Sequence, residues 1–323
     1  MQIAFVGDVM LGRLVNDRLR TADPAYSWGD TLPILRRADL RIANLECVLA
    51  DGGAPEPGKV FTFRSDLKNV HALATAGIDA VSLANNHVLD YGANAFREMM
   101  PALDAAGILH AGAGEDLAAA QRPAVLRAGG TAVGFVAFTD NEPDWDAAAR
   151  SPGVHYVPVA GPGDRAERLL ELVRETSSGV QLLIVSAHWG GNWGSEPLPE
   201  HRALARRLVD AGADVVFGHS PHIVRGVEFY RDRPVIYGAG DFIDDYAVDP
   251  VERNDRSFIF LLEADDGVPQ LLRLFPTVIA GCQARMARGD ARGSTARMAR
   301  LCAALGTAGS WNARDGCLEL RPR

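Results

Sequence analysis

Two apolar runs that each end in a histidine place the strongest constraint on how this chain folds. Residues 180–188 (VQLLIVSAH) and 214–219 (DVVFGH) have the composition of buried strands, and residues 197–213 between them have the apolar spacing of a helix. A strand, a helix and a second strand form the crossover unit of an α/β protein, which brings the carboxyl ends of both strands to one edge of the sheet. We therefore expect His188, His219 and the following His222 to share a site.

The composition is that of an ordinary globular protein. Of the 323 residues, 47% are hydrophobic and 23% are charged, and the formal net charge is -8. Nonspecific nucleic-acid binding depends on Lys and Arg neutralising phosphates, so a net negative charge argues against it. We expect a small-molecule or peptide substrate and no nucleic-acid partner.

The amino-terminal residues do not have the pattern of a targeting segment. The apolar run at residues 3–6 is short and lacks a basic leader, which is unlike a secretory signal. No run approaches the ~20 apolar residues that span a bilayer. The sequence therefore predicts a cytoplasmic protein with no membrane span.

Polar side chains follow several other apolar runs. They are Asp8 after residues 3–6, Asn44 and Glu46 in the run that begins at residue 38, Asn85, Asn86 and His87 after residues 78–84, and Asp241 after residues 234–240. Taken alone, Asp8 also fits a helix N-cap, and Asn85 and Asn86 also fit a turn. Their repeated placement favours one shared site, because independent caps would not require it.

Two hairpin patterns interrupt the alternation of strands and helices. Residues 123–139 contain two β-rich runs across a Gly-Gly pair, and residues 257–279 contain two more across an Asp-Gly pair. An Arg- and Ala-rich helix at about residues 284–305 and a short strand at residues 317–322 are predicted to follow. A pure doubly wound parallel sheet is therefore not expected.

The polar residue types suit a metal site. Carboxylates, an amide oxygen and imidazoles together bind one or two divalent transition metals such as Mn, Fe or Zn, with open positions for water. His87, beside Asn86, is a candidate to protonate a leaving group, and Asp8 is a candidate catalytic group. The candidate ligands are Asp8, Glu46, Asn86, His188, His219 and His222.

Other residues near the same strand ends are candidate substrate contacts. They are Arg13, Arg64, Asn85, Trp189 and Asp241. Arg64 either holds an anionic group or is a solvated cation. Trp189 and Trp193 follow His188 in the sequence HWGGNW and flank the expected site, where they indicate either a stacking pocket or buried packing.

The ordered set of motifs resembles a known family. GDVMLGR, NLE, LANNHVLDYG, AHWG, GHSPH and YGAGDF, spread over about residues 1–245, are similar to the poly-γ-glutamate capsule biosynthesis (CapA-type) family of the calcineurin-like metallophosphatase superfamily. The resemblance implies an α/β fold in which two packed β-sheets are flanked by helices, in four layers α/β/β/α. We expect a single domain over residues 1–323, with the hairpin and helix in residues 255–323 completing it.

The resemblance also implies roles for individual residues. It places Asp8 at the first metal-binding position, Glu46 near the bridging carboxylate and Asn86 at the amide ligand. His87 falls at the proton-donor position. His188 and His219 fall at imidazole-ligand positions, and His222 is a further candidate ligand.

The chain departs from the superfamily pattern in several places. Met10 stands where the first motif usually has histidine, and Glu46 stands where aspartate is common. GHSPH has one residue more than the usual motif, and Asp241 replaces a frequent asparagine. These departures leave mononuclear or metal-free chemistry open.

Three functions follow from these observations. The leading hypothesis is a metal-dependent hydrolase acting on a phosphoester or an acidic γ-glutamyl-type substrate. The second is a metal-independent peptide epimerase in which Asp8 pairs with His219 or His222 as acid and base. The third is a noncatalytic protein that binds or assembles a polymer.

Overall fold

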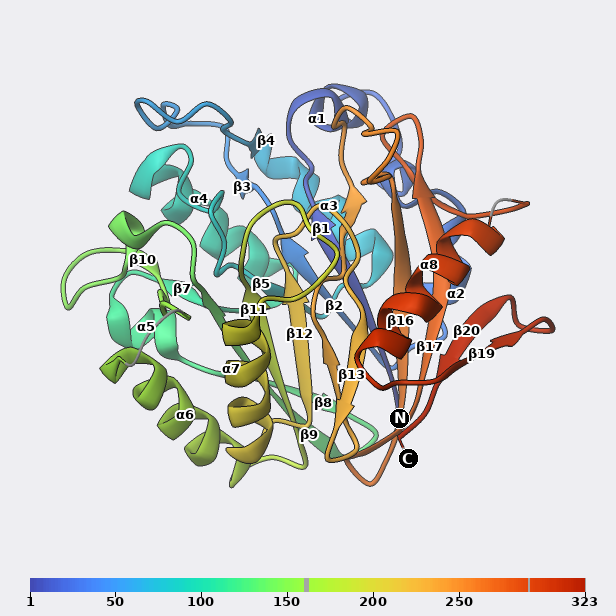
Figure 1. Cartoon of the computed structure of the whole chain (residues 1–323). Helices are drawn as coiled ribbons and strands as arrows, with labels where there is room; N and C mark the ends of the chain where they lie inside the picture. Colours follow the sequence, from blue (N-terminus) through green and yellow to red (C-terminus); the bar gives the residue numbers. More distant parts are fainter. Residues whose placement is uncertain (160–162, 290, 323) are drawn as a thin grey trace.

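The computed structural model of the chain describes residues 1–159, 163–289 and 291–322, and its described strands form two large sheets (Figure 1). The larger sheet has the order β19-β20-β17-β16-β1-β2-β5-β6, with β15 paired to β1 and β18 paired to β17. Its strands are β1 (Gln2–Val9), β2 (Leu40–Leu45), β5 (Ala80–Ser82), β6 (Leu109–Ala111), β15 (Asp241–Ile243), β16 (Arg256–Asp265), β17 (Val268–Ile279), β18 (Ala284–Met286), β19 (Gly309–Asn312) and β20 (Cys317–Leu320).

The smaller sheet contains the predicted crossover unit. Its order is β13-β14-β12-β11-β9-β8. The strands are β8 (Ala124–Ala128), β9 (Thr131–Thr139), β11 (Leu182–His188), β12 (Val215–His219), β13 (Val227–Tyr230) and β14 (Arg233–Ile236). β11 and β12 run parallel on either side of helix α7 (Pro199–Asp210) in the sequence, which confirms the predicted strand, helix and strand.

Helices and short strand pairs complete the described chain. The α-helices are α1 (Arg13–Leu19), α2 (Leu32–Leu35), α3 (Val70–Ala76), α4 (Gly92–Ala105), α5 (Leu117–Gln121), α6 (Asp164–Ser177), α7 and α8 (Ala291–Ala304). The 3-10 helices are η1 (Tyr26–Thr31), η2 (Leu67–Asn69) and η3 (Pro143–Trp145). The short strands pair as β3 (Val48–Leu49) with β4 (Arg64–Ser65), and β7 (Ala113–Gly114) with β10 (Gly153–Val154). None of the helices among the described residues has the length and apolar character needed to cross a membrane.

The side chains of β1 divide between two cores. Ile3 and Phe5 belong to the core between the two sheets, whereas Ala4 and Val6 belong to the core that includes residues of α1 to α4. Successive side chains of a strand point to opposite faces, so this alternation places the larger sheet between the helices and the smaller sheet. A third core joins the other face of the smaller sheet to α6 and α7, which lie side by side in Figure 1. The predicted four-layer, two-sheet α/β fold is confirmed.

Both predicted hairpins are confirmed, but the strand predicted to end near Asp241 is divided between the two sheets. β14 ends at Ile236 in the smaller sheet, and β15 pairs with β1 in the larger one. The chain crosses between the sheets at residues 237–240. There the backbones approach closely, because a Cβ at Gly7 would lie 1.8 Å from the carbonyl oxygen of Gly240. The prediction of one strand was wrong because both halves have the same β-rich composition.

The carboxyl-terminal helix begins later than predicted. Residues 284–286 form β18, an edge strand hydrogen-bonded to β17, and α8 begins at Ala291. Residue 290, within the predicted helix, lies outside the described residues. Pairing with β17 satisfies the backbone groups of the first three residues, so tertiary context outweighs their helical composition.

Candidate metal centre

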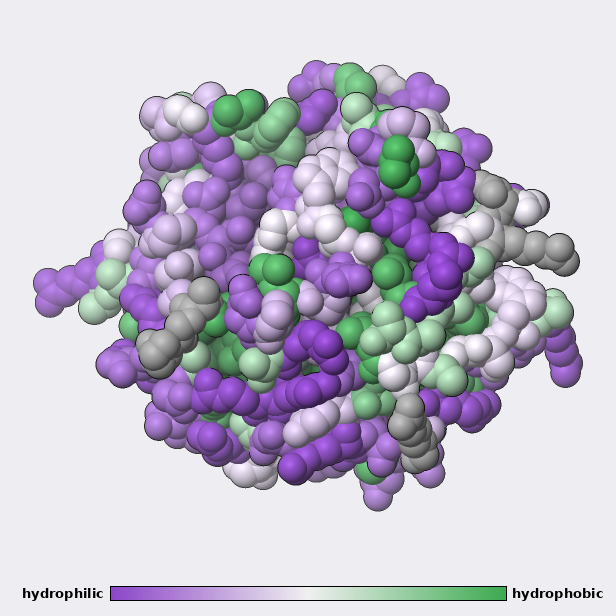
Figure 2. Space-filling view, in the orientation of Figure 1, coloured by the Kyte–Doolittle hydropathy of each residue, from purple (hydrophilic) through white to green (hydrophobic). Residues whose placement is uncertain are grey.

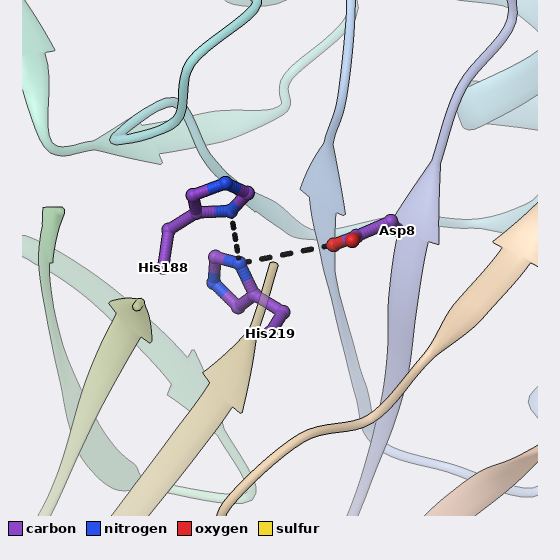
Figure 3. Close-up of side chains that lie close together, drawn as sticks. All are labelled: Asp8, His188 and His219. Carbon is purple, nitrogen blue, oxygen red and sulfur yellow. Dashed lines mark hydrogen bonds and ion pairs between the residues drawn. The ribbon is translucent and has the colours of Figure 1, made fainter. Parts of the chain in front are cut away.

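The candidate site lies where strands of both sheets end. Asp8 is the next-to-last residue of β1, and His188 and His219 are the last residues of β11 and β12. β11 and β12 pair in parallel register with His188 opposite His219, so both rings leave the sheet at the same level. Figure 3 shows the three side chains pointing toward one another from separate strands. Residues far apart in the sequence thus meet at one rim.

Asp8, His188 and His219 form a first group of metal-ligand type. Their ligand atoms all lie within 4.8 Å of one another, and all three residues are buried. Nδ1 of His188 is 2.9 Å from Nδ1 of His219, which is 3.8 Å from Oδ1 of Asp8. Nε2 of His188 lies 3.0 Å from Oδ1 of Asn86. An amide oxygen only accepts, so this contact assigns the ring proton of neutral His188 to Nε2. Nδ1, which faces Nδ1 of His219, is then the unprotonated nitrogen that could bind an ion.

Asp8 also belongs to a second group, with His222 and Asp241. Their ligand atoms again lie within 4.8 Å of one another. Nδ1 of His222 is 3.0 Å from Oδ1 of Asp241, and β15 places Asp241 directly opposite Asp8 on β1. The family resemblance placed Glu46 near the bridging carboxylate, and the sequence placed Asp241 among the candidate substrate contacts. In the structure, the carboxylate that the two groups share is Asp8.

The charges of the site suit a divalent cation. Burial raises the pKa of Asp8 to about 7 and raises the pKa of Asp241 well above its usual range. Burial also lowers the pKa of His219 to about 3 and holds that of His188 well below its usual range, so both imidazoles are neutral donors at neutral pH. Oδ2 of Asp8 and Oδ2 of Asp241 are buried without a hydrogen-bond partner among the described residues. A bound cation would give these oxygens a partner and compensate their buried charge.

Asn44 is a site residue that was not among the predicted ligands. Its Nδ2 donates to Oδ1 of Asp8 at 2.7 Å and also to Oε2 of Glu46, so it holds two carboxylates in place. Oε2 of Glu46 lies 3.7 Å from Nδ1 of His188. Asn85, predicted to contact substrate, is fully buried and donates to Oδ1 of Asn44 at 3.0 Å. The signal for Asn44 was its place at the end of the apolar run that precedes Glu46.

His87 is held by a short chain of charged groups. Its Nδ1 lies 2.6 Å from Oδ2 of Asp90, and Oδ1 of Asp90 pairs with Nζ of Lys59 at 2.8 Å. Lys59 also donates to the carbonyl oxygen of Asn86. Burial lowers the pKa of His87, and the hydrogen bond to Asp90 opposes this shift. When the ring proton is on Nδ1, the unprotonated nitrogen is Nε2. Nε2 lies 3.8 Å from Oε1 of Glu46 and faces the carboxylates of the site.

A pocket of about 500 Å³ opens over these groups. Its lining includes Arg13, His87, Asn86, Glu46 and His222, but its described lining does not include Arg64 or Trp189.

Of the five predicted substrate contacts, Arg13 belongs to the described lining of the pocket. Asn85 and Asp241, whose contacts are given above, lie outside that lining, as do Arg64 and Trp189. The guanidinium of Arg64 donates to the carbonyl oxygen of Gly52 at 2.9 Å. Trp189 is fully buried, and its Nε1 donates to the carbonyl oxygen of Tyr237 at 3.0 Å. Of the two interpretations of the tryptophans, buried packing describes Trp189, and a pocket wall describes Trp193.

Comparison with known proteins identifies relatives of the chain. Residues 2–246 match the family model described as bacterial capsule synthesis protein PGA_cap. A probable polyglutamine synthesis accessory protein of Mycobacterium tuberculosis (strain ATCC 25618 / H37Rv) is 37% identical over 248 residues, which cover 74% of this chain and 65% of that protein. The capsule biosynthesis protein CapA of Bacillus anthracis is 28% identical over 249 residues, covering 76% of this chain and 60% of that protein. The chain thus spans less than two thirds of the length of these relatives.

A solved structure has a similar fold. The crystal structure of a hypothetical protein from Thermus thermophilus superposes with a TM-score of 0.52 at 19% identity, over 85% of this chain and 98% of that one. At this level of identity the similarity extends to the fold alone. It agrees with the arrangement of two sheets described above.

Proposed function

The chain belongs to the bacterial capsule synthesis protein family PGA_cap, within the metallophosphatase-like superfamily, and on that premise we propose that it is a metal-dependent hydrolase. The observation that carries the proposal is the pair of ligand groups that share Asp8. Two ions held by one carboxylate are a recurring arrangement in hydrolases of phosphoesters and amides. When bound, such ions supply Lewis acidity and lower the pKa of a coordinated water.

Residues of the site have separate proposed roles in holding ligand atoms, transferring a proton and binding the substrate. His188, His219, His222 and Asp241 hold ligand atoms around Asp8, and Asn44 orients the carboxylates of Asp8 and Glu46. Nε2 of His87 exchanges a proton with the leaving group, while Asp90 fixes the orientation of the ring through Nδ1. Arg13, at the wall of the pocket, is the cation placed to meet an anionic group of the substrate.

We propose a phosphoester or an acidic γ-glutamyl-type amide as the substrate class. The superfamily favours the phosphoester, and the names of the relatives, which refer to capsule and polyglutamine synthesis, favour the acidic amide. Both reactions develop negative charge on oxygen next to the proposed ions, which makes one site suitable for either.

The geometry favours hydrolysis over epimerisation by Asp8 and His219. An epimerase needs two bases on opposite sides of one substrate carbon. Oδ1 of Asp8 and Nδ1 of His219 are 3.8 Å apart, which leaves no room for that carbon, and His219 is fully buried. The same argument applies to Asp8 and His222, because their ligand atoms lie within 4.8 Å of each other.

The test combines metal content with turnover. The protein is loaded with Mn²⁺, desalted and subjected to elemental analysis, then assayed on a phosphomonoester, a phosphodiester and a γ-glutamyl dipeptide. We expect bound metal and hydrolysis of at least one substrate. His188→Ala and His222→Ala should each lose about half of the metal, whereas Asp8→Ala should lose all of it, because Asp8 lies in both groups.

His71→Ala is the matched control, since His71 is exposed on α3. Its metal content and turnover should equal those of the unaltered protein. Protein that binds no metal yet exchanges a peptide α-proton in D₂O would replace the proposal with the epimerase. Protein that neither hydrolyses nor exchanges, but binds an anionic polymer, would replace it with the binding role.

A further inference from the structure

An arc of aromatic rings lines the pocket from its mouth to its floor. The ring centroids of Trp193 and His222 are 6.1 Å apart, those of His222 and Tyr246 are 5.1 Å apart, and those of Tyr246 and Phe63 are 5.6 Å apart. Phe63 reaches His87 with a centroid separation of 4.1 Å. All five residues line the pocket, so the arc leads from solvent to the proposed proton-transfer group.

The mouth of the pocket exposes large apolar side chains. Val60 is 84% exposed, Phe61 is 62% exposed and Trp193 is 50% exposed, and all three line the pocket. Figure 2 shows hydrophobic surface over the loop between β3 and β4, as one of several hydrophobic patches on this face. Single apolar side chains scattered over a surface are common in soluble proteins. Several gathered at one pocket indicate a binding surface.

The loop that presents Trp193 is held from beneath by a buried arginine. Arg225 is 2% exposed, and its guanidinium donates to the carbonyl oxygens of Gly191 at 3.0 Å, Trp193 at 3.3 Å and Gly194 at 2.9 Å. Three bonds from one planar group fix the loop backbone on either side of the indole. The ring is therefore positioned before a ligand arrives, which lowers the entropy cost of binding.

The pocket offers few charges to an acidic polymer. Among the described residues that line it, the cations are Arg13 and Lys59. Lys59 already pairs with Asp90 at 2.8 Å and with Glu142 at 3.3 Å. Arg13 also pairs with a carboxylate, Asp245 at 3.4 Å, but its side chain is 42% exposed and that of Lys59 is 16% exposed. Arg13 is therefore the cation that can meet a further acidic group. A polymer with a carboxylate on every residue needs several cations for binding, and this pocket presents mainly aromatic rings.

We propose that this pocket binds a substrate whose reacting group is attached to an aromatic ring, with at most one further acidic group. The ring lies along the arc between Trp193 and Phe63, and the reacting group points to the floor at His87. This inference rests on the proposed function, because it concerns the same site. Of the two proposed substrate classes, it selects the phosphoester and argues against an acidic γ-glutamyl polymer.

The test compares two inert ligands that differ in the ring alone. Binding of 1-naphthylmethylphosphonate and of methylphosphonate to the Mn²⁺-loaded protein is measured by calorimetry and by quenching of tryptophan fluorescence. We expect the naphthyl compound to bind at least about tenfold more tightly, since stacking and burial of a ring favour it. Trp193→Ala should reduce the ratio of the two affinities, naphthyl compound over methylphosphonate, to about threefold or less. It should also abolish most of the fluorescence quenching. Phe61→Ala, at an exposed position, should reduce the ratio in the same direction.

Trp311→Ala is the control, because Trp311 is 45% exposed on β19 and does not line the pocket. It should leave the ratio unchanged. Equal affinities for the two phosphonates, no binding of either, or tighter binding of a γ-glutamyl pentapeptide would overturn the inference. Naphthyl binding without hydrolysis of any ester would support the inference while refuting the proposed hydrolase. Equal kcat/KM for alkyl and aryl phosphates would refute the inference and leave the hydrolase standing.

Discussion

Lys59 contacts residues from several segments around the candidate site. It pairs with Asp90 and Glu142, donates to the carbonyl oxygen of Asn86, and places its ammonium 4.2 Å from the ring centroid of Trp145. It therefore ties the loop before β4 to the segment that carries His87. Lys59 reaches the proposed catalytic group His87 through Asp90, so the proposed function gives it a positioning role.

Replacing Lys59 with methionine keeps the length of the side chain and removes its charge. We expect kcat to fall by about tenfold, a typical effect of losing an outer partner of a catalytic group. Metal content should not change, because Lys59 contacts none of the proposed ligand atoms. Steady-state kinetics with elemental analysis checks this, with Lys68→Met as control, since Lys68 is exposed and bonds to carbonyl groups near α1. Unchanged kcat in Lys59→Met would contradict the positioning role.

His155 makes stability depend on pH. Its Nδ1 donates to the carbonyl oxygen of Ala137 at 3.1 Å, and burial lowers its pKa from 6.5 to about 4. As pH falls, the unfolded chain binds the proton first, so the contribution of His155 to stability is lost between pH 6.5 and pH 4. From pH 7 to pH 4 this loss amounts to about 3 kcal/mol.

His155→Asn separates the pH dependence of stability due to His155 from that due to the other buried histidines. In His155→Asn the side-chain amide can still donate to Ala137, and it has no proton to gain. The free energy of unfolding of the variant, from urea titrations at several pH values, should therefore fall by about 3 kcal/mol less than that of the unaltered protein over this range. The remaining histidines titrate in both proteins and cancel in the difference. Parallel pH curves for the two proteins would show that His155 does not titrate in this range.

Some residues of the candidate site could be predicted from their type and their place in the sequence. Strand-end residues such as Asp8, His188 and His219 were located because carboxyl ends of neighbouring strands converge in this class of fold. Trp189 and Trp193 could not be distinguished, since both follow the same strand. Their positions differ because Trp189 lies directly after the strand and packs behind it, whereas the following glycines turn Trp193 toward the pocket.

At the scale of elements, the crossing from β14 to β15 sets the second ligand group. Asp241 lies opposite Asp8 because β15 leaves the smaller sheet and pairs with β1. The local pattern could not reveal this, because pairing partners are distant in sequence. The close approach of Gly7 to Gly240 makes the crossing sensitive to any side chain.

Gly7→Ala tests the crossing. The added Cβ would lie 1.8 Å from the carbonyl oxygen of Gly240, so the strands must separate. We expect the free energy of unfolding, measured in urea, to fall by about 3 kcal/mol or more, together with loss of metal binding. Gly179→Ala is the control, because its Cβ would have an ordinary contact of 3.7 Å. If Gly7→Ala unfolds like the control, β15 does not lie against β1 as described.

At the scale of the whole molecule, the family match ends at residue 246 while the larger sheet continues. β16 pairs with β1 in antiparallel register, and Phe258 and Phe260 fill the core between the sheets. The residues after 246 therefore complete the sheet that carries Asp8. This agrees with the expectation of a single domain, which stays a prediction.

Truncation after residue 250 tests that prediction. The shortened chain would expose the edge of β1 and lose β16, β17 and α8 from the core, so we expect aggregation or no cooperative unfolding. The full chain should unfold in one transition when followed by circular dichroism and by tryptophan fluorescence. A shortened chain that melts cooperatively would show that residues 1–250 fold as a separate domain.

Phe5 and Phe217 lie in the layer beneath the site, one from each sheet, with ring centroids 5.2 Å apart. Asp8 follows Phe5 on one strand, and His219 follows Phe217 on the other. The gap between the two ligands is therefore set by the thickness of hydrocarbon packed below them. If the proposed ions bind here, their selection by radius would depend on the two phenyl rings, although neither ring would touch an ion.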